Sequence, residues 1–384
     1  MEREVTRREL LQTAGMTALA SLAPSSAAGA VRPPTSPVSL GRCGTYDLSV
    51  LLPKVESLFD QIGGIKKLVA GKTVAVKVNM VNTPSQGVLG LPSNRTYHVH
   101  PNVARAVAIL LDKAGAKRIR FLESSFSRDP IEQFFISGGW NLKDFESLKA
   151  RVEFEETRNM GNGKRYYRLK VPWGGSLYPA YDLNHSYVDC DVYVSVAKLK
   201  NHGAAGVTLS MKNNFGITPT ALYGGPEPDE NSVKNRAAFH GGNYRIAKGL
   251  PQEVNPNAPR RASCLVPRHI VDVVGIRPID LQLIDGIESV SGGEGPWVGA
   301  LKRQVPNLLL AGRNPVCTDA IATVCMGYDP MAKSATGPFP GDNHLTLAAA
   351  LGLGTNNPKE IETVGLPLSD AVYPYRFQPA SRNT

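Results

Sequence analysis

The sequence predicts an α/β protein with a mainly parallel sheet, helices on both faces, an irregular excursion and a lid-like insertion. Short runs rich in β-branched residues alternate along the chain with helical patterns, which favours a parallel sheet covered on both faces. No repeat at solenoid periods is visible. Polar residues follow five of these strands, and in such a sheet the strand ends open into one ligand-binding crevice.

The first thirty residues are typical of an export signal. The pair Arg7-Arg8 is followed by two leucines, as in a twin-arginine signal, and a weakly apolar run covers residues 14–23. Residues 28–30, Ala-Gly-Ala, supply a cleavage site. We expect an exported, periplasmic protein that begins near Val31. The alternative is a frayed N-terminus of a cytoplasmic protein.

After this segment we expect a linker and helical segment over 31–71, which opens with a Pro/Ser-rich stretch. The main domain should cover 72–365. It begins with a β-loop-α-β unit whose crossover is right-handed. Pro101 at a first helical position and Gly115 after the last predict the bounds of its helix. The expected elements are a helix over 51–59, a strand over 73–78, a helix over 101–114 and a strand over 119–122.

Two irregular regions interrupt the regular alternation. Residues 126–190 form an excursion expected to cap the sheet edge, with two short helical pieces and two short strands. Residues 218–262 are rich in Pro, Gly and Asn, which indicates an ordered loop or a lid. Residues 366–384 form a tail. The remaining expected elements are strands over 192–197, 281–284, 308–310 and 361–364, and helices over 269–274, 316–326 and 345–351.

The charge balance points to an anionic partner. Lys and Arg total 43 against 33 Asp and Glu, a net charge of +10. Basic residues neither cluster nor alternate with aromatic ones, so a small anionic ligand is favoured over nucleic acid. No later segment is long and apolar enough to be a transmembrane anchor. The five cysteines form no C-x-x-C pair, and we expect no iron–sulfur cluster. The oligomeric state is not indicated.

The strongest candidate site lies in residues 198–216, directly after the strand over 192–197. Cations and amides are dense here, and burying them is costly unless an anion or a metal compensates them. We predict that His202, Lys200 and Lys212 are catalytic: the histidine would move a proton and the lysines would neutralise negative charge. The alternative is that the lysines pair with exposed acids and the histidine packs structurally.

Residues at other strand ends extend this predicted site. His100 precedes a helix N-terminus, where amide donors favour an anion; a simple helix cap is the alternative. Backbone amides around Gly293 and Gly295 would contact a phosphate or carboxylate; a structural turn is the alternative. The full set of predicted ligand-binding residues is Lys77, Asn79, His100, Lys198, Asn213, Gly293, Gly295 and Asp285.

A divalent metal ion is an open alternative to a purely organic site. The candidate ligands are His202, His240 and Asp319. Asp285 and Asp319 are favoured instead as partners of the lysines, and His240 as a surface histidine of the insertion. The sequence contains neither G-x-S-x-G nor H-E-x-x-H, so these hydrolase motifs are absent.

The order of these motifs resembles the domain of unknown function 362 family, over roughly 72–365. Many relatives carry ferredoxin-like cysteine clusters, whereas this sequence has none, and the family name implies no mechanism. The resemblance rests on Val-Lys77-Val-Asn79, His100-Pro101, Lys198-Leu-Lys200-x-His202, Lys212-Asn213-x-x-Gly216, Asp285-Gly286, Gly293-Glu-Gly-Pro296, Pro315-Val-x-x-Asp319 and Leu351-Gly-Leu-Gly354.

The sequence therefore predicts an enzyme that acts on a small anionic substrate, with or without a metal ion. A non-catalytic binding protein for an anionic ligand would use the same residues as a clamp. A redox partner that borrows its cofactor from another subunit is the third alternative. Neither the substrate nor the reaction is indicated.

Overall fold

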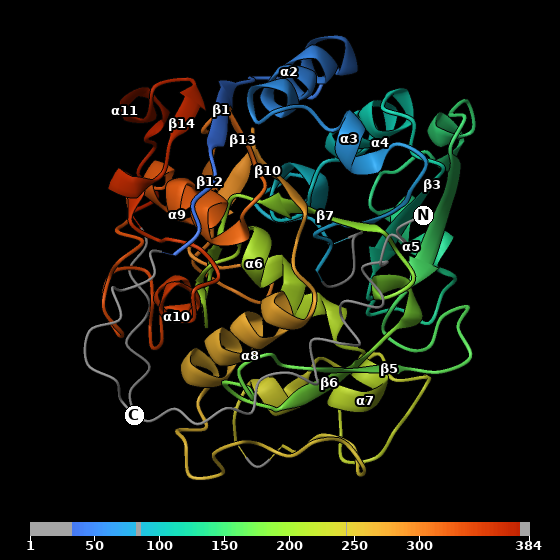
Figure 1. The fold of residues 1–384 in the computed structure, drawn as a ribbon, viewed down its shortest axis with the longest axis vertical. Coiled ribbons are helices and arrows are strands. Elements are labelled where there is room, and N and C mark those ends of the chain that lie inside the picture. Colours follow the sequence, from blue (N-terminus) through green and yellow to red (C-terminus); the bar gives the residue numbers. More distant parts are fainter. Residues whose placement is uncertain (1–32, 82–85, 243, 377–384) are drawn as a thin grey trace, which may run out of the picture.

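The computed structural model describes residues 33–81, 86–242 and 244–376, so the predicted export signal lies outside them. Its centre is an eight-stranded sheet (Figure 1). The strands in spatial order are β14 (Thr363–Gly365), β1 (Val38–Arg42), β13 (Leu308–Gly312), β10 (Leu281–Gly286), β7 (Val192–Lys198), β2 (Thr73–Lys77), β3 (Arg118–Glu123) and β4 (Arg151–Glu156).

The prediction of a mainly parallel sheet is confirmed. The strands β10, β7, β2, β3 and β4 are parallel to one another, as are β1 and β14. Strand β13 alone is antiparallel to both of its neighbours. It follows β10 through a hairpin-like extension, and antiparallel neighbours need no crossover helix. That extension consists of β11 (Ser289–Ser291) and β12 (Lys302–Gln304).

Successive side chains of each strand point to opposite faces of this sheet and pack into two separate hydrophobic cores. In β2, Val74 and Val76 pack into one core while Ala75 packs into the other. In β13, Leu309 belongs to the first core and Leu310 to the second. Because successive side chains of a strand point to opposite faces, both faces of this sheet are apolar and must be covered.

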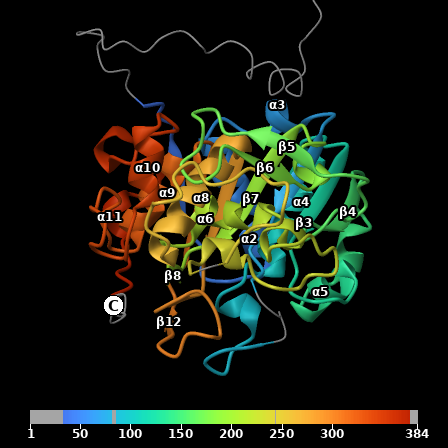
Figure 2. The same ribbon diagram turned by 90° about the horizontal axis from the view of Figure 1, so that it is seen from below.

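Helices cover both faces, as predicted. In Figure 1, α2 to α4 lie above the sheet and α6 and α8 below it, and Figure 2 shows the strands side by side from below. The first core is covered by α2 (Leu48–Gln61), α3 (Lys66–Val69), α4 (Pro101–Lys113) and α5 (Ile131–Ser137). The second core is covered by α6 (Leu209–Asn213), α7 (Thr220–Tyr223), α8 (Ala262–Ile276), α9 (Pro315–Cys325), α10 (His344–Ala350) and α11 (Leu368–Ala371).

The smaller elements lie around this framework. The two-stranded sheets are β5 (Tyr167–Lys170) with β6 (Ala180–Leu183) and β8 (Asn201–His202) with β9 (Gly206–Val207). The 3-10 turns are η1 (Ser93–Arg95), η2 (Leu142–Phe145), η3 (His185–Tyr187), η4 (Asn214–Ile217), η5 (Ala237–Phe239) and η6 (Pro358–Glu360). Among the described residues, no helix combines the length and apolarity needed to cross a bilayer.

Strand β1, strand β4 and helix α8 are among the elements that differ from the sequence prediction. Strand β1 lies where a linker was expected, because Val38 and Leu40 bury their side chains in the second core. Residues 126–190 do not only cap the sheet edge: they supply its edge strand β4, which pairs with β3. Helix α8 begins at Ala262, seven residues earlier than predicted. Proline is a common helix-breaking signal, so the helix was expected to begin after Pro267, but Pro267 lies inside it.

Candidate functional site

A cavity of about 1610 Å³ opens where β2 and β3 end. This is the carboxyl edge of the parallel strands, where α/β sheets commonly bind ligands. Other parts of its wall come from β8, α6, residues 235–240 of the insertion, residues 261–263, the glycine loop, Gly292–Gly299, and residues 335–340. Among the described residues, the lining has six cationic side chains, Lys77, Lys212, Arg236, Arg261, Lys302 and Arg376, and two acidic ones, Glu123 and Glu294.

Lys77 is a compensated cation of this wall. Its Nζ lies 2.6 Å from Oε1 of Glu123, the last residue of β3, and both side chains are buried. The other carboxylate oxygen of Glu123 accepts a hydrogen bond from the Met80 amide at 2.8 Å. A buried ion pair is tolerated when hydrogen bonds satisfy its remaining atoms. The sequence placed Glu123 at a strand end but did not assign it this partner.

The side chain of Asn213, at the end of α6, contacts both β7 and the segment that follows β2. Its Nδ2 donates to Ser195 Oγ at 3.0 Å, and its Oδ1 accepts from Asn79 Nδ2 at 3.2 Å. The Lys77 ammonium is a weaker donor to the same oxygen, at 3.5 Å. Three predicted ligand-binding residues therefore meet at this end of the cavity.

Lys212 is a cation without a counter-charge. Only 8% of the residue is exposed, and within the described residues its side-chain ammonium forms no hydrogen bond or ion pair. Its Nζ lies over the ring of Phe215, 4.1 Å from the centroid, in a cation–π contact. Burial, with Arg236 and Lys77 nearby, lowers the pKa of Lys212 to about 7, although Glu294 opposes this shift.

Helix α6, which carries Lys212, begins with a strained residue. Leu209 has φ +48°, a left-handed conformation that is unfavourable for a leucine. The Asp319 carboxylate holds this turn by accepting the amides of Ser210 at 2.9 Å and Met211 at 2.7 Å. Asp319 therefore positions α6, whereas the sequence analysis favoured it as a direct partner of the lysines. Burial raises the pKa of Asp319 to about 7.

Arg236 is the second buried cation of the cavity wall that has no carboxylate partner among the described residues, and no sequence pattern singled it out. Its Nη2 donates to Ser124 Oγ and to the Gly216 carbonyl, both at 2.8 Å, and its Nε donates to the Thr218 carbonyl. All these partners are uncharged, and no carboxylate of the described residues lies within ion-pair distance. Burial lowers the pKa of Arg236 to about 10.

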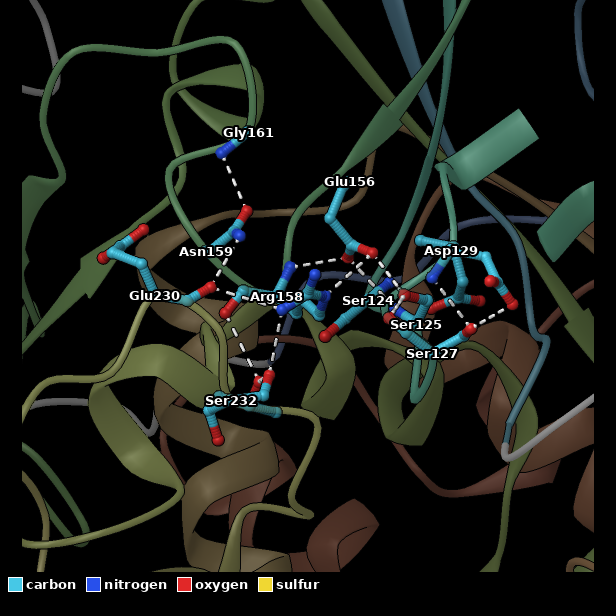
Figure 3. A network of polar contacts seen from close by, with 12 residues as sticks. Ser124, Ser125, Ser127, Asp129, Glu156, Arg158, Asn159, Gly161, Glu230 and Ser232 are labelled. Carbon is cyan, nitrogen blue, oxygen red and sulfur yellow. Dashed lines mark hydrogen bonds and ion pairs between the residues drawn. The ribbon is translucent and has the colours of Figure 1, made fainter. Parts of the chain in front are cut away.

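A polar network fixes the insertion that carries Arg236 (Figure 3). Arg158 donates through Nη1 to the Glu230 and Ser232 carbonyls, at 3.2 and 3.1 Å. The same guanidinium contacts Glu156 Oε2 through Nε at 3.2 Å. Glu156 also accepts the Ser125 amide at 3.0 Å, beside the Ser124 that contacts Arg236. The insertion is thus joined to the ends of β3 and β4.

The two histidines in the wall both leave Nε2 free, but in opposite protonation states. His202 Nδ1 accepts the amides of Ala204 and Ala205 at 3.1 and 3.3 Å, so the proton of the neutral ring is on Nε2. His240 Nδ1 lies 2.9 Å from the Arg236 carbonyl and must donate to it, which leaves Nε2 as an acceptor. Burial lowers the pKa of His202 well below its usual value, and desolvation by the surrounding wall lowers the pKa of His240, although His240 remains exposed.

Glu294 connects the glycine loop to the His202 turn. Its carboxylate accepts the Gly203 amide at 2.7 Å and the Trp297 indole N–H at 2.9 Å. Burial opposes ionisation of this carboxyl, but the adjacent His202, the two donors and Lys212 lower its pKa to about 2. The glycines of this loop are visible in the sequence, but no pattern there assigns a role to Glu294 or Trp297.

Lys200 lies behind this loop and does not line the cavity. Its Nζ donates to the carbonyls of Tyr97 at 2.6 Å and Glu294 at 3.0 Å. Gly293 and Gly295 pack inside the loop: a Cβ on Gly293 would approach Val298 within 2.6 Å, and one on Gly295 would approach the Trp297 ring within 2.5 Å. These three predicted residues shape the loop.

Three further predicted ligand residues form a separate buried cluster outside the lining. Lys198 Nζ lies 2.8 Å from Asp285 Oδ2, and both residues are fully buried. Asp285 also accepts the His100 amide at 3.1 Å. The His100 ring stacks on Tyr46 with centroids 3.8 Å apart, and its Nδ1 caps α4. This cluster joins β7, β10 and α4.

The structure does not bring the candidate metal ligands together as a set. His202 and His240 line the cavity, whereas Asp319 lies at the start of α6. Within the described residues, no group of three or more His, Cys, Asp or Glu side chains is arranged to hold a metal ion. A metal ion therefore stays a prediction. The five cysteines are free thiols.

Comparisons with known proteins give a family, a relative and a solved structure. The model of a family described as "Domain of unknown function (DUF362)" matches residues 74–324. The thylakoid-associated protein sll1697 of Synechocystis sp. is 26% identical over 346 residues, which cover 88% of this chain and 90% of that protein. The lactate racemase apoprotein of Thermoanaerobacterium thermosaccharolyticum is similar with a TM-score of 0.37 and 14% identity. That match covers 70% of this chain and 54%, about half, of the racemase chain.

Proposed function

The chain belongs to the domain of unknown function 362 family, and we propose that it is an enzyme that binds a small anionic substrate at Lys212 and Arg236. The observation that carries this proposal is that two buried cations face one cavity and have no carboxylate partner in the part of the chain that the structure describes. A buried charge without a counter-charge is costly, and a bound anion removes that cost.

The excess of cations over acids in the lining supports the same ligand class. Among the buried acids, Glu123 is occupied by Lys77, and Glu294 is held by the Gly203 amide and the Trp297 indole. The anionic group of the substrate would therefore lie beside Lys212 and the Arg236 guanidinium. Lys77, Asn79 and Asn213 would support the adjoining wall.

The opposite tautomers of the histidines favour an enzyme over a binding protein. His202 presents an N–H donor, and a neutral imidazole in this form stabilises negative charge that develops on a substrate oxygen. His240 presents an unprotonated nitrogen, which is the form required of a general base. We propose that His240 accepts a substrate proton while His202 donates a hydrogen bond. The proton-moving role that was predicted for His202 is therefore given to His240 in this proposal.

A ligand screen by thermal shift tests the proposal. Sulfate, phosphate and small carboxylates should raise the Tm, since a ligand at a hundredfold excess over Kd stabilises by about 2.7 kcal/mol. Lys212→Met should remove the shift. The matched control is Lys149→Met, which deletes the same charge from an exposed lysine outside the cavity. An undiminished shift in Lys212→Met would remove this lysine from the site.

A further inference from the structure

Trp297 is a large aromatic residue left exposed in the cavity wall. It lines the cavity, and 56% of the residue is accessible. Burying a tryptophan ring is strongly favourable, so an exposed ring within a cavity marks a surface that a ligand can cover. The proton-transfer scheme gives this residue no role.

The indole is also fixed in position before any ligand arrives. Its N–H donates to Glu294, whose other oxygen accepts the Gly203 amide beside His202. The benzo edge of the ring lies directly against Gly295, where a Cβ would come within 2.5 Å of it. A ring held in this way loses little conformational entropy when a ligand stacks on it.

The cavity is larger than a small anion needs. Its volume of about 1610 Å³ exceeds the range of about 300–1,000 Å³ that is usual for drug-sized ligands. Part of the lining is apolar. The apolar side chains of the lining include Phe126, Trp297, Val298, Phe339 and Pro340.

From these observations we propose that the substrate is a bipartite molecule, an anionic group attached to a planar aromatic body that stacks on Trp297. The proposal rests on the proposed function, because it takes Lys212 and Arg236 as the site of the anionic group. Glu294 joins the two halves of the site, since it fixes the indole and the His202 turn together.

Calorimetric titration with phenyl phosphate and methyl phosphate tests this class of ligand. Both probes are phosphate monoesters, and they differ in the aromatic ring. Wild-type protein should bind phenyl phosphate on the order of tenfold more tightly than methyl phosphate. Trp297→Ala should bring this ratio close to one and leave the Kd of methyl phosphate unchanged. Trp297→Phe, which keeps an aromatic ring but loses the bond to Glu294, should retain most of the ratio.

Two results overturn the inference alone. One is an unchanged ratio in Trp297→Ala; the other is an equal loss of both ligands, which indicates that the indole only holds the loop. In either case the proposed function stands if methyl phosphate binds to wild-type protein and is lost in Lys212→Met. If methyl phosphate does not bind to wild-type protein, the proposed anion site and this inference fail together.

Discussion

At the scale of single residues, the lysines near the strand ends differ in what compensates them. Lys77 has Glu123, and Lys198 has Asp285. Lys200 has two backbone carbonyls. Only Lys212, among these four, has no polar partner in the described residues and depends on the Phe215 ring. A bound anion therefore gains most from this lysine.

The histidines separate catalysis from simple binding. His240→Gln removes the general base, so kcat should fall by about a hundredfold or more while substrate affinity changes little. The measurements are turnover and binding of whichever ligand the thermal screen identifies. His202→Gln is the matched variant, because its side-chain amide retains a donor; it should keep part of the activity. A collapse of affinity in His240→Gln would place this ring in a binding clamp.

At the scale of elements, the position of Lys212 depends on the cap that Asp319 provides for α6. Asp319→Ala leaves the Ser210 and Met211 amides buried without an acceptor, at a cost of about 1–3 kcal/mol for each. The Tm should fall, and anion affinity should fall with it because α6 shifts.

The control for this prediction is Asp272→Ala. Asp272 is equally buried and accepts the Ser176 and Leu177 amides at 2.6 and 2.8 Å, away from the cavity lining. This variant should lower the Tm and retain anion affinity in the remaining folded protein, as judged by calorimetric titration below the transition. Equal affinity losses in both variants would attribute the effect of Asp319→Ala to general destabilisation.

The strands and the strand-end site residues could be predicted because their signals are local. The apolar run 192–197 and the polar residues after it are adjacent in sequence, and a parallel sheet brings such ends together. Strand β1 could not be predicted from its Pro/Ser-rich surroundings, since its burial depends on β13 and β14. Arg236 lies in an irregular segment without periodicity, so no pattern singled it out.

The partners of the lysines could not be predicted from the sequence either. Lys198 and Lys200 are two residues apart at the end of one strand and carry the same side chain, so no local pattern distinguishes them. One pairs with an aspartate from β10, and the other with carbonyls from two loops. These long-range contacts decide which lysine has no compensating partner. The prediction from sequence alone therefore included too many site residues.

At the scale of the whole molecule, the export prediction concerns a segment outside the described residues. Arg7→Lys combined with Arg8→Lys keeps the net charge but removes the twin-arginine signal, so the precursor should accumulate in the cytoplasm. Fractionation with immunodetection measures this, and the N-terminal sequence of the exported wild-type protein should begin at or near Val31. Efficient export of the double variant would reject a twin-arginine route.

The burial of Lys212 in the fold makes both the folding stability and the anion affinity depend on pH. Its folded pKa of about 7 lies below the ordinary value of 10.5, so the anion-free folded state binds fewer protons than the unfolded chain between these values. The contribution of Lys212 to stability therefore rises as the pH rises through this window. Anion affinity has the opposite sign: it is highest below pH 7, where the ammonium is charged.

The most direct test of the account is the Kd of sulfate between pH 6 and pH 9, because sulfate keeps its charge throughout. In wild-type protein the Kd should increase above pH 7 by up to about tenfold per pH unit. In Lys212→Met, binding should be weak and nearly independent of pH, whereas Lys149→Met should follow the wild type. A Kd that is equally low and equally flat in wild type and Lys212→Met would contradict the assignment of Lys212 as the cation that awaits an anion.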